Sequence, residues 1–467
     1  MRILSICSLL VLWVHLSSCR LGPWGTRHVK NIPIAADEDP GNPLILTSYL
    51  KYGRIQEARQ SSRVPPKYFL GVESFSGYLT VNETYNSNSF FWFIPSTDVN
   101  YTEAPVLLWL QGGPGADSIY AAFTENGPFE MIDETHLKRR DVSWTSTHSV
   151  LYIDNPVGTG FSFTNGRWCT SEEEIGEDLY NALIQFFQLF PELQKNDFFI
   201  TGESYAGKYI PAVAYTIHKR NPDAELKINL KGISMGNGLS DPANQLNYGD
   251  YLFQIGLIDY NVRAVMKELE KQAVDLINEE KYEDAFIIFD KLLNGDLTEG
   301  PTVFKNATGF DNYYNYLHSK ASDDSQYSVF VQQNHIRQAL HVGDKSFLTD
   351  KEVENSLRAD MVKSVAPWVS ELLDHYKVLI YNGQLDIIVA YPLTINYLSR
   401  LNFSAANEYK VAKRNQWIVN NEIAGYVKEA GNLVEVLVRN AGHMVPTDQP
   451  EWALDLISKF VRNIPLH

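Results

Sequence analysis

Cysteine is scarce in this chain. Only Cys7, Cys19 and Cys169 occur among its 467 residues, and the first two lie in an N-terminal segment that we expect to be removed. The mature protein then holds one thiol and no intramolecular disulfide. Cys169 has no strand leading into it and no glycine turn, so we interpret it as a bystander thiol. No His or Cys cluster has the spacing of metal ligands, and the sequence predicts no metal and no cofactor.

Long apolar runs are also rare. Arg2 is followed by an apolar run over residues 3–16 and by the small residues 17–19, which together have the pattern of a cleaved signal peptide. A membrane anchor needs about 20 apolar residues, and this run is shorter and is interrupted by His15. We therefore expect residues 1–19 to be a signal peptide, and the protein to be secreted or to enter the lumen of a lysosome or yolk body.

An excess of positive charge is absent. Lysine and arginine number 40 against 56 aspartates and glutamates, and the formal net charge is −16. This balance disfavours nucleic acid and anionic membranes as partners. A hydrophobic content of 44% in a chain of this length indicates a large globular core, and a homodimer is compatible with these numbers. Four sequons, about as many as chance gives, are candidate glycosylation sites, at Asn82, Asn100, Asn306 and Asn402.

Residues 20–66 mix proline, glycine and basic residues without a sustained period, and we interpret them as an N-terminal extension or pro-segment. After them, short apolar runs alternate with helical segments, which is typical of an α/β fold with a mostly parallel sheet and helices on both faces. The strongest strand candidates are residues 106–110, 149–153, 198–201, 228–233, 377–381 and 433–438. Ligands of such sheets bind beyond the carboxyl ends of the strands, so functional residues are expected in the turns that follow them.

Between residues 242 and 368 the pattern changes to amphipathic helical segments, for instance residues 261–293. A separate helical domain would have this pattern too. The strand pattern resumes at Lys377, as if one sheet had been interrupted. We therefore predict a core in two parts, residues 67–241 and 369–467, with a helical lid inserted at residues 242–368.

The segment 198–207, Phe-Phe-Ile-Thr-Gly-Glu-Ser-Tyr-Ala-Gly, places Ser204 on a tight turn between an apolar strand and a helical stretch. This is the context of the nucleophile elbow of α/β-hydrolases. The turn needs small residues two positions before and two after the serine, and Gly202 and Ala206 meet that need. The motif is short, and the strand and helix around it are what make Ser204 a candidate nucleophile.

A serine nucleophile needs a base and a carboxylate that orients the base. In α/β-hydrolases the order is Ser, then Asp or Glu, then His, each after a strand. Asp386 follows the strand candidate 377–381, and His443 follows the strand candidate 433–438. Alone, Asp386 is better explained as a helix cap and His443 as a loop histidine. Their joint order favours a triad with Ser204.

A glycine-rich turn, Gln-Gly-Gly-Pro-Gly at residues 111–115, directly follows the strand candidate 106–110. An oxyanion needs preorganised backbone N–H donors, and we nominate the amides of Gly113 and Tyr205. A plain β-turn is the alternative interpretation, because Gly-Pro pairs mark turns in many proteins.

Five motifs together resemble the signatures of the serine carboxypeptidases. They are Trp-Leu-Gln-Gly-Gly-Pro-Gly at 109–115, Asp-Asn-Pro-Val-Gly-Thr-Gly-Phe-Ser at 154–162, Gly-Glu-Ser-Tyr-Ala-Gly at 202–207, Tyr-Asn-Gly-Gln-Leu-Asp at 381–386 and Gly-His-Met-Val-Pro at 442–446. The chain is most similar to the vitellogenic carboxypeptidase-like branch of that family. The resemblance implies an α/β-hydrolase fold and removal of the C-terminal residue from peptides or proteins with a free C-terminus, through an acyl-enzyme on Ser204.

The resemblance also implies that a hydrogen-bond network holds the substrate carboxylate, at Trp109, Gln111, Glu125 and Glu203. Two carboxyl groups bind a third only if at least one of them is protonated and donates. We therefore predict that Glu125 and Glu203 are coupled and that peptidase activity is highest at acidic pH.

Three departures from the family pattern bear on this expectation. Most members carry asparagine where this chain has Gln111, so carboxylate capture is expected to shift or weaken. Asp117 places a carboxylate near the oxyanion turn, where its charge would oppose an oxyanion or rearrange the glutamate pair. The disulfide cysteines common in the family are absent, which leaves the order of the lid to packing alone.

Two other functions stay open at this point. One is an esterase or acyltransferase that uses the same triad on a different acyl donor. The other is a non-catalytic storage or chaperone-like protein that kept the fold. Against the second, nothing in packing requires Ser, Asp and His at these three turns.

Overall fold

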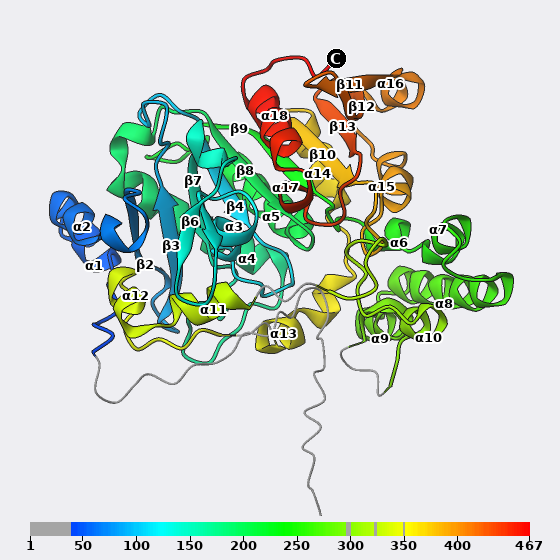
Figure 1. Ribbon diagram of the computed structural model, residues 1–467, viewed down its shortest axis with the longest axis horizontal. Coiled ribbons are helices and arrows are strands. Elements are labelled where there is room, and N and C mark those ends of the chain that lie inside the picture. The colour runs from blue at the N-terminus through cyan, green and yellow to red at the C-terminus, as the bar shows by residue number, and fades with distance from the viewer. Residues whose placement is uncertain (1–38, 296–299, 322–324, 349–350) are drawn as a thin grey trace, which may run out of the picture.

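In the computed structural model (Figure 1) the described residues are 39–295, 300–321, 325–348 and 351–467. The predicted signal peptide, residues 1–19, and the first part of the predicted pro-segment, residues 20–38, lie outside them. No helix within the described ranges is both long enough and apolar enough to cross a bilayer.

One sheet forms the centre of the described fold, with the strand order β1-β2-β3-β7-β4-β8-β9-β10-β13-β12-β11. The strands are β1 (Arg63–Val64), β2 (Ser74–Asn82), β3 (Ser87–Ile94), β4 (Val106–Leu110), β7 (Ser149–Ile153), β8 (Phe198–Glu203), β9 (Leu230–Gly236), β10 (Lys377–Gly383), β11 (Arg414–Val419), β12 (Glu422–Ala430) and β13 (Leu433–Val438). The neighbours from β7 to β13 pair in parallel, and the pairs toward both edges are antiparallel. Strands β5 (Phe129–Met131) and β6 (Leu137–Arg139) form a separate hairpin.

The central strands arise from apolar runs because both faces of the sheet are buried. In β4, Leu108 and Leu110 belong to one apolar core and Leu107 and Trp109 to the other. All four side chains are fully buried. Three of the predicted strands match the observed bounds, and the other three differ by two or three residues at their ends.

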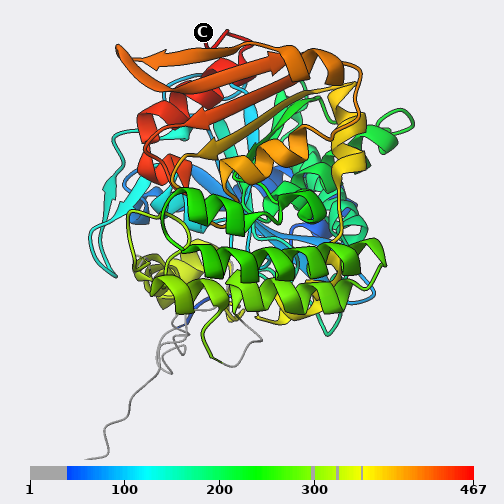
Figure 2. The same cartoon turned by 90° about the vertical axis from the view of Figure 1, so that its right-hand side faces the viewer.

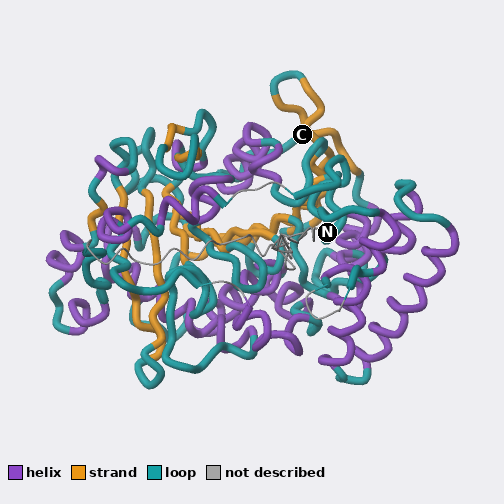
Figure 3. The backbone as a smooth tube through the Cα atoms, turned by 60° about the horizontal axis from the view of Figure 1, so that its bottom comes forward, coloured by secondary structure: helices purple, strands orange, loops and turns teal. Residues whose placement is uncertain are grey.

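Helices cover both faces of the sheet (Figures 1 and 3). One face packs against α4 (Glu172–Leu189), α5 (Ala206–Arg220) and α14 (Ala366–Leu373). The other face packs against α3 (Tyr120–Thr124), α11 (Gln326–Val331), α12 (Asn334–Ala339) and α18 (Pro450–Val461). The C-terminal part of the core adds α15 (Tyr391–Leu398), α16 (Ala406–Val411) and α17 (Val445–Asp448). The predicted fold class, a mostly parallel sheet between helices, is confirmed.

The chain between β9 and β10 is helical. It begins with α6 (Pro242–Gln245), α7 (Tyr248–Gln254), α8 (Tyr260–Asn278), α9 (Tyr282–Phe289), a π-helical turn (Asp290–Asn294) and α10 (Val303–Thr308), of which α7, α8 and α9 stack on one another (Figure 2). Part of the remaining insertion, predicted to belong to one helical lid at residues 242–368, does not lie with these helices. Helices α11 and α12 cross to the second face of the sheet, where Tyr327 and Phe330 pack against Phe123, and α13 (Lys351–Met361) then returns to α9.

Residues 44–64 fall in the segment predicted as an extension or pro-segment, yet they belong to the core. Leu46, at the start of α1 (Thr47–Lys51), and Ala58, in α2 (Ile55–Ser61), are fully buried, and β1 pairs with β2. The sequence shows no period here because these elements are only two to seven residues long.

Three of the four sequons are on the surface. Asn100, Asn306 and Asn402 are exposed, whereas Asn82 at the end of β2 is half-buried. Cys169 is a buried free thiol, and burial raises its pKa far above the usual range. Among the described side chains, no group of three or more His, Cys, Asp or Glu residues is arranged to hold a metal ion.

Candidate active site

The parallel strands β8, β10 and β13 end at the same edge of the sheet. Glu203 at the end of β8 pairs with Gly236 of β9, which pairs with Tyr381 of β10. Gly383 of β10 pairs in turn with Val438, the last residue of β13. The predicted catalytic residues follow these ends, Ser204 after β8, Asp386 after β10 and His443 after β13.

Ser204 has a left-handed backbone, with a φ of 63°, which is a strained conformation for a residue other than glycine. The turn around it is tight. A Cβ on Gly202 would lie 2.1 Å from the carbonyl oxygen of Leu110, and a Cβ on Gly112 would lie 2.5 Å from the Cβ of Ser204. The Ser204 N–H donates to the carbonyl oxygen of Gly236 at 3.0 Å. The serine is therefore presented on a rigid elbow between β8 and α5.

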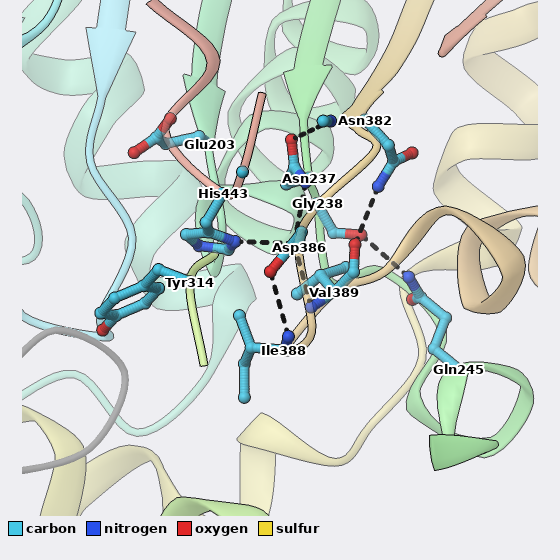
Figure 4. Close-up of polar contacts among 12 residues, drawn as sticks. Glu203, Asn237, Gly238, Gln245, Tyr314, Asn382, Asp386, Ile388, Val389 and His443 are labelled. Atoms are coloured by element: carbon cyan, nitrogen blue, oxygen red, sulfur yellow. Dashed lines mark hydrogen bonds and ion pairs between the residues drawn. The ribbon is translucent and has the colours of Figure 1, made fainter. Parts of the chain in front are cut away.

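Asp386 and His443 are in direct contact (Figure 4), with 2.9 Å between Asp386 Oδ2 and His443 Nδ1. The Asp386 carboxylate is fully buried and also accepts from the N–H groups of Ile388 and Val389, at 3.0 and 3.2 Å. Because a carboxylate only accepts, Nδ1 carries the proton and Nε2 presents a lone pair. No hydrogen bond joins Nε2 to Ser204 or to any other described residue.

Asn237 is a member of this site that the sequence did not predict. Its Nδ2 donates to Asp386 Oδ2 at 2.8 Å, and its Oδ1 accepts from the N–H of Gly383 at 3.0 Å (Figure 4). The backbone of Asn237 is left-handed, with a φ of 43°, a conformation that asparagine tolerates. The only signal for it in the sequence is an Asn-Gly pair after a strand, which by itself indicates a turn.

Tyr314, in the loop after α10, brings the insertion to His443. The His443 N–H donates to the carbonyl oxygen of Tyr314 at 2.7 Å, and the two ring centroids are 5.2 Å apart. A Cβ on Gly442 would lie 2.4 Å from the same carbonyl oxygen. The glycine before His443 is therefore required by the passage of the insertion backbone, which no local pattern in the sequence indicates.

The amides nominated as oxyanion donors, those of Gly113 and Tyr205, lie next to the nucleophile. A Cβ on Gly112 would lie 2.6 Å from the Tyr205 nitrogen and 2.9 Å from Ser204 Oγ. Gly113 has a φ of 107°, which only glycine adopts readily. Within the described residues neither amide donates a backbone hydrogen bond. Both N–H groups are therefore available to a negatively charged oxygen.

A chain of buried hydrogen bonds ends beside the nucleophile. Trp109 Nε1 donates to Gln111 Oε1 at 2.9 Å, and Gln111 Nε2 donates to Glu203 Oε1 at 2.8 Å. All three side chains are buried. The side chain of Gln111, one methylene longer than asparagine, thus reaches both Trp109 and Glu203. Glu203 directly precedes Ser204 in the chain.

Glu125 is the fourth residue that the resemblance assigned to carboxylate binding. It lies at the C-terminal end of α3 and is 1% exposed. Burial raises the pKa of the Tyr381 hydroxyl well above its ordinary value, and the charges of Glu203 and Glu125 raise it further. Both glutamates are therefore close to one buried phenol, on β10.

Asp117 bonds to residues of the second core, the apolar core that contains Leu107 and Trp109 of β4. Its Oδ2 accepts from the Tyr327 hydroxyl at 2.7 Å, and its Oδ1 accepts from the N–H of Tyr120 at 3.0 Å. Burial, followed by the charge of Asp117, raises the pKa of the neighbouring Asp154 well above its ordinary value. These contacts place Asp117 in the buried core beside Asp154.

A mostly parallel sheet that carries a serine elbow after one strand, and a contacting Asp and His after two later strands, is the architecture of an α/β-hydrolase. Comparison with known sequences narrows this class. Residues 65–463 match the sequence profile of serine carboxypeptidases. The chain belongs to the serine carboxypeptidase family, and the predicted resemblance and enzyme class are confirmed.

Similar proteins cover almost the whole chain. The venom serine carboxypeptidase of Apis mellifera is 54% identical, over 93% of this chain and 94% of its own. The probable serine carboxypeptidase CPVL of Homo sapiens is 47% identical, over 92% of each chain. The vitellogenic carboxypeptidase of Aedes aegypti is also 47% identical, over 90% of each chain.

A solved structure supports the fold. The prohormone-processing carboxypeptidase Kex1(Δ)p of Saccharomyces cerevisiae superimposes with a TM-score of 0.75. The superposition covers 87% of this chain and 96% of the yeast chain, at 23% sequence identity. At that identity the likeness establishes the shared fold, and the roles of individual residues rest on the geometry above.

Proposed function

We propose that the protein removes the C-terminal residue from peptides through an acyl-enzyme on Ser204, with His443 as base and Asp386 as the carboxylate that orients it. The observation that carries the proposal is the 2.9 Å contact between Asp386 Oδ2 and His443 Nδ1, at the sheet edge where the Ser204 elbow lies. With the proton on Nδ1, Nε2 is the nitrogen that takes the proton of the serine.

Acylation begins when Ser204 Oγ attacks the carbonyl carbon of the last peptide bond and His443 Nε2 takes its proton. The amides of Gly113 and Tyr205 donate to the carbonyl oxygen as it becomes negatively charged. His443 then protonates the leaving amino acid, and a water molecule repeats the sequence to release the shortened peptide. Asp386 stays ionised and stabilises the imidazolium.

The substrate carboxylate is bound, in this proposal, by Trp109, Gln111, Glu125 and Glu203. A substrate carboxylate that enters beside two glutamates is repelled unless one of the glutamates is protonated and donates a hydrogen bond to it. Gln111 donates to Glu203 Oε1, and we assign the required proton to the pair formed by Glu203 and Glu125. Since the pair gains its proton as the pH falls, peptidase activity is highest at acidic pH.

Covalent labelling with a fluorophosphonate tests the nucleophile. We expect the wild-type protein to be labelled and Ser204→Ala to be unlabelled, because the probe reacts with an activated serine. Ser61→Ala, at the exposed end of α2, is the matched control and should label like the wild type. Labelling of Ser204→Ala at the wild-type rate would contradict the proposal.

Paired substrates test carboxylate recognition. We expect Glu203→Gln and Glu125→Gln each to lower kcat/KM about 10-fold or more on a blocked dipeptide with a free C-terminus, and to change turnover of its C-terminal amide far less. Equal turnover of both substrates by both variants, unchanged from the wild type, would remove the basis for a carboxypeptidase. A wild-type kcat/KM that peaks above neutral pH would remove the basis for the shared proton.

The lumen of the secretory pathway is the location that fits this chain. The signal-peptide pattern at residues 1–19 supports it, and so does the exposure of the sequons at Asn100, Asn306 and Asn402. Treatment of the protein secreted by animal cells with an N-glycosidase tests both points, because loss of glycans raises electrophoretic mobility.

A further inference from the structure

A buried ion pair lies directly behind the nucleophile elbow. Lys208, in the first turn of α5, is fully buried, and its Nζ donates to the carbonyl oxygen of Asp360 and to Asp360 Oδ2, the latter at 3.1 Å. Asp360 is 3% exposed and lies in the last turn of α13. A cation is favoured at the C-terminal end of a helix, where carbonyl groups have no partner in the helix. Lys208 therefore caps a helix of the insertion.

Glu172, at the start of α4, adds a second buried carboxyl group to this pair. It is 1% exposed. Burial raises the pKa of Glu172 well above its ordinary value; the charge of Lys208 and the nearby Tyr205 hydroxyl oppose this shift, and the charge of Asp360 adds to it. At the surface, Lys363 Nζ lies 3.7 Å from Asp360 Oδ1. We call Glu172, Lys208 and Asp360 the buried charge cluster.

The side chain of Tyr205 lies within the buried charge cluster. Lys208 Nζ is 5.5 Å from the centroid of its ring, and the ring of Tyr209 packs against it in a T-shaped contact at 5.1 Å. Burial raises the pKa of the Tyr205 hydroxyl, and the charges of Glu172 and Asp360 raise it further, so both carboxyl groups are near. The backbone N–H of Lys208 also donates to the carbonyl oxygen of Tyr205 at 2.9 Å.

Stability does not account for this arrangement. Desolvation of buried charges offsets most of their attraction, and apolar side chains of the same size often serve a core as well. Lys208 also places a positive charge at the N-terminal end of α5, where the helix dipole opposes it. The cluster does fix relative positions. The Lys208 ammonium group bonds to α13 and contacts Tyr205, and it thereby holds α13 and the Tyr205 side chain in place relative to α5.

We propose that the buried charge cluster orients the Tyr205 amide toward the oxyanion. It also couples this orientation to the packing of the insertion against the core. The inference rests on the proposed function, since this amide meets an oxyanion only if Ser204 is the nucleophile. Lys208 is the positioning residue. It touches Tyr205 and Asp360, and it acts on the reaction through the peptide between Ser204 and Tyr205. Because α13 packs on α9, movement of the stacked insertion helices reaches the same peptide.

Lys208→Met tests the proposal, because it keeps an unbranched side chain, one atom shorter, and removes its charge. We expect kcat to fall about 10-fold or more on a blocked dipeptide while KM stays within about twofold, since a misaimed donor weakens the transition state and leaves ground-state binding intact. We also expect the shape of the pH profile to change, because the charge of Lys208 opposes the raised pKa of Glu172 and its removal raises that pKa further. A structural role alone would lower the amount of active enzyme and leave the shape of the pH profile unchanged.

Lys219→Met is the matched control. Lys219 also lies on α5 and also pairs with a helix between β9 and β10, through Glu371 of α14, but the side chains of this pair are 50% and 35% exposed. We expect its kcat to stay within about twofold of the wild type. Asp360→Asn is a milder variant for the case that Lys208→Met does not fold, since the amide still accepts from Lys208. It should show a smaller loss of the same kind.

Titration of active sites with a fluorophosphonate separates the outcomes. A folded Lys208→Met or Asp360→Asn protein with the wild-type kcat per labelled site and the wild-type pH profile overturns the positioning role. A wild-type protein that does not label overturns the proposed function itself. A selective loss of kcat per labelled site, with the altered pH profile, supports the role of the cluster.

Discussion

Asn237 and His443 bind the same oxygen of Asp386. Asn237 Nδ2 is 2.8 Å from Asp386 Oδ2, and His443 Nδ1 is 2.9 Å from it. One donor comes from the turn after β9 and the other from the turn after β13, so the carboxylate is held between the strands that flank β10. Asp386 thus keeps one orientation toward the imidazole.

Asn237→Gly removes both side-chain hydrogen bonds and keeps the left-handed backbone, which glycine adopts freely. We expect kcat to fall about 10-fold to 100-fold, because His443 loses a fixed partner. We also expect the free energy of unfolding to fall by about 1–3 kcal/mol, because Asp386 and the Gly383 N–H lose buried partners. Steady-state kinetics and urea unfolding measure the two effects. Asn440→Gly, also left-handed but exposed, is the control, and a wild-type kcat in Asn237→Gly would show that Asp386 is oriented without it.

Gln111→Asn shortens the link between Trp109 and Glu203. The present bonds are 2.9 and 2.8 Å long, and a side chain one methylene shorter cannot keep both. We expect KM to rise about 10-fold for a blocked dipeptide with a free C-terminus, with a smaller change in kcat, because the lost contact serves binding. The C-terminal amide of the same dipeptide is the control substrate. An equal rise in KM for both would place Gln111 outside carboxylate recognition.

Gly112→Ala adds one methyl group at the nucleophile. The new Cβ would lie 2.5 Å from Ser204 Cβ, 2.6 Å from the Tyr205 nitrogen and 2.9 Å from Ser204 Oγ, so either the serine or the oxyanion amide must move. We expect the rate of fluorophosphonate labelling to fall at least about 100-fold. Circular dichroism of the same sample checks that the protein is folded. Labelling at the wild-type rate would show that the elbow can shift without loss.

The sequence predicted those parts of the fold and site that depend on local pattern. The run 106–110 became β4 with the predicted bounds, because a strand buried on both faces needs a continuous apolar run. The order of Ser204, Asp386 and His443 along the chain identified three turns at one sheet edge, since parallel strands end together.

The rest of the site depends on contacts that no local pattern encodes. Asn237 meets Asp386 only because β9 and β10 pair in parallel. Tyr314 meets His443 because the insertion passes over the turn after β13. The core role of residues 44–64 was hidden because their elements are too short to show a period, and the crossing of α11 and α12 depends on aromatic contacts in the second core.

Asp178, in α4, makes stability depend on pH. Burial raises its pKa from the ordinary 3.8 to about 6. The unfolded chain therefore ionises at lower pH than the folded protein, and stability falls as the pH rises from about 4 to about 6. We expect Asp178→Asn to raise the free energy of unfolding by up to about 3 kcal/mol at about pH 7.5 and to leave it unchanged at about pH 4. Urea unfolding at the two pH values measures this, and an equal effect at both would contradict the assignment.

His148 acts in the opposite direction. It is fully buried, and burial, aided by the charge of Arg462, lowers its pKa from the ordinary 6.5 to about 3. Arg462 Nη1 lies 3.1 Å from His148 Nε2, and since arginine only donates, Nε2 accepts and Nδ1 carries the proton, 3.2 Å from the carbonyl oxygen of Trp144. The unfolded chain gains a proton below about pH 6.5 that the folded protein does not take until about pH 3, so stability falls with acidification across that window.

His148→Gln offers an acceptor to Arg462 and a donor to Trp144 without a titrating ring. We therefore expect the variant to lose less stability than the wild type between about pH 7.5 and about pH 4, by up to about 3 kcal/mol. Urea unfolding of both proteins at the two pH values gives this difference directly. His335→Gln, at an exposed position, should show no such difference. If His148→Gln and the wild type lose the same free energy on acidification, His148 is already protonated in the folded protein at about pH 4, and the neutral tautomer held by Arg462 is wrong.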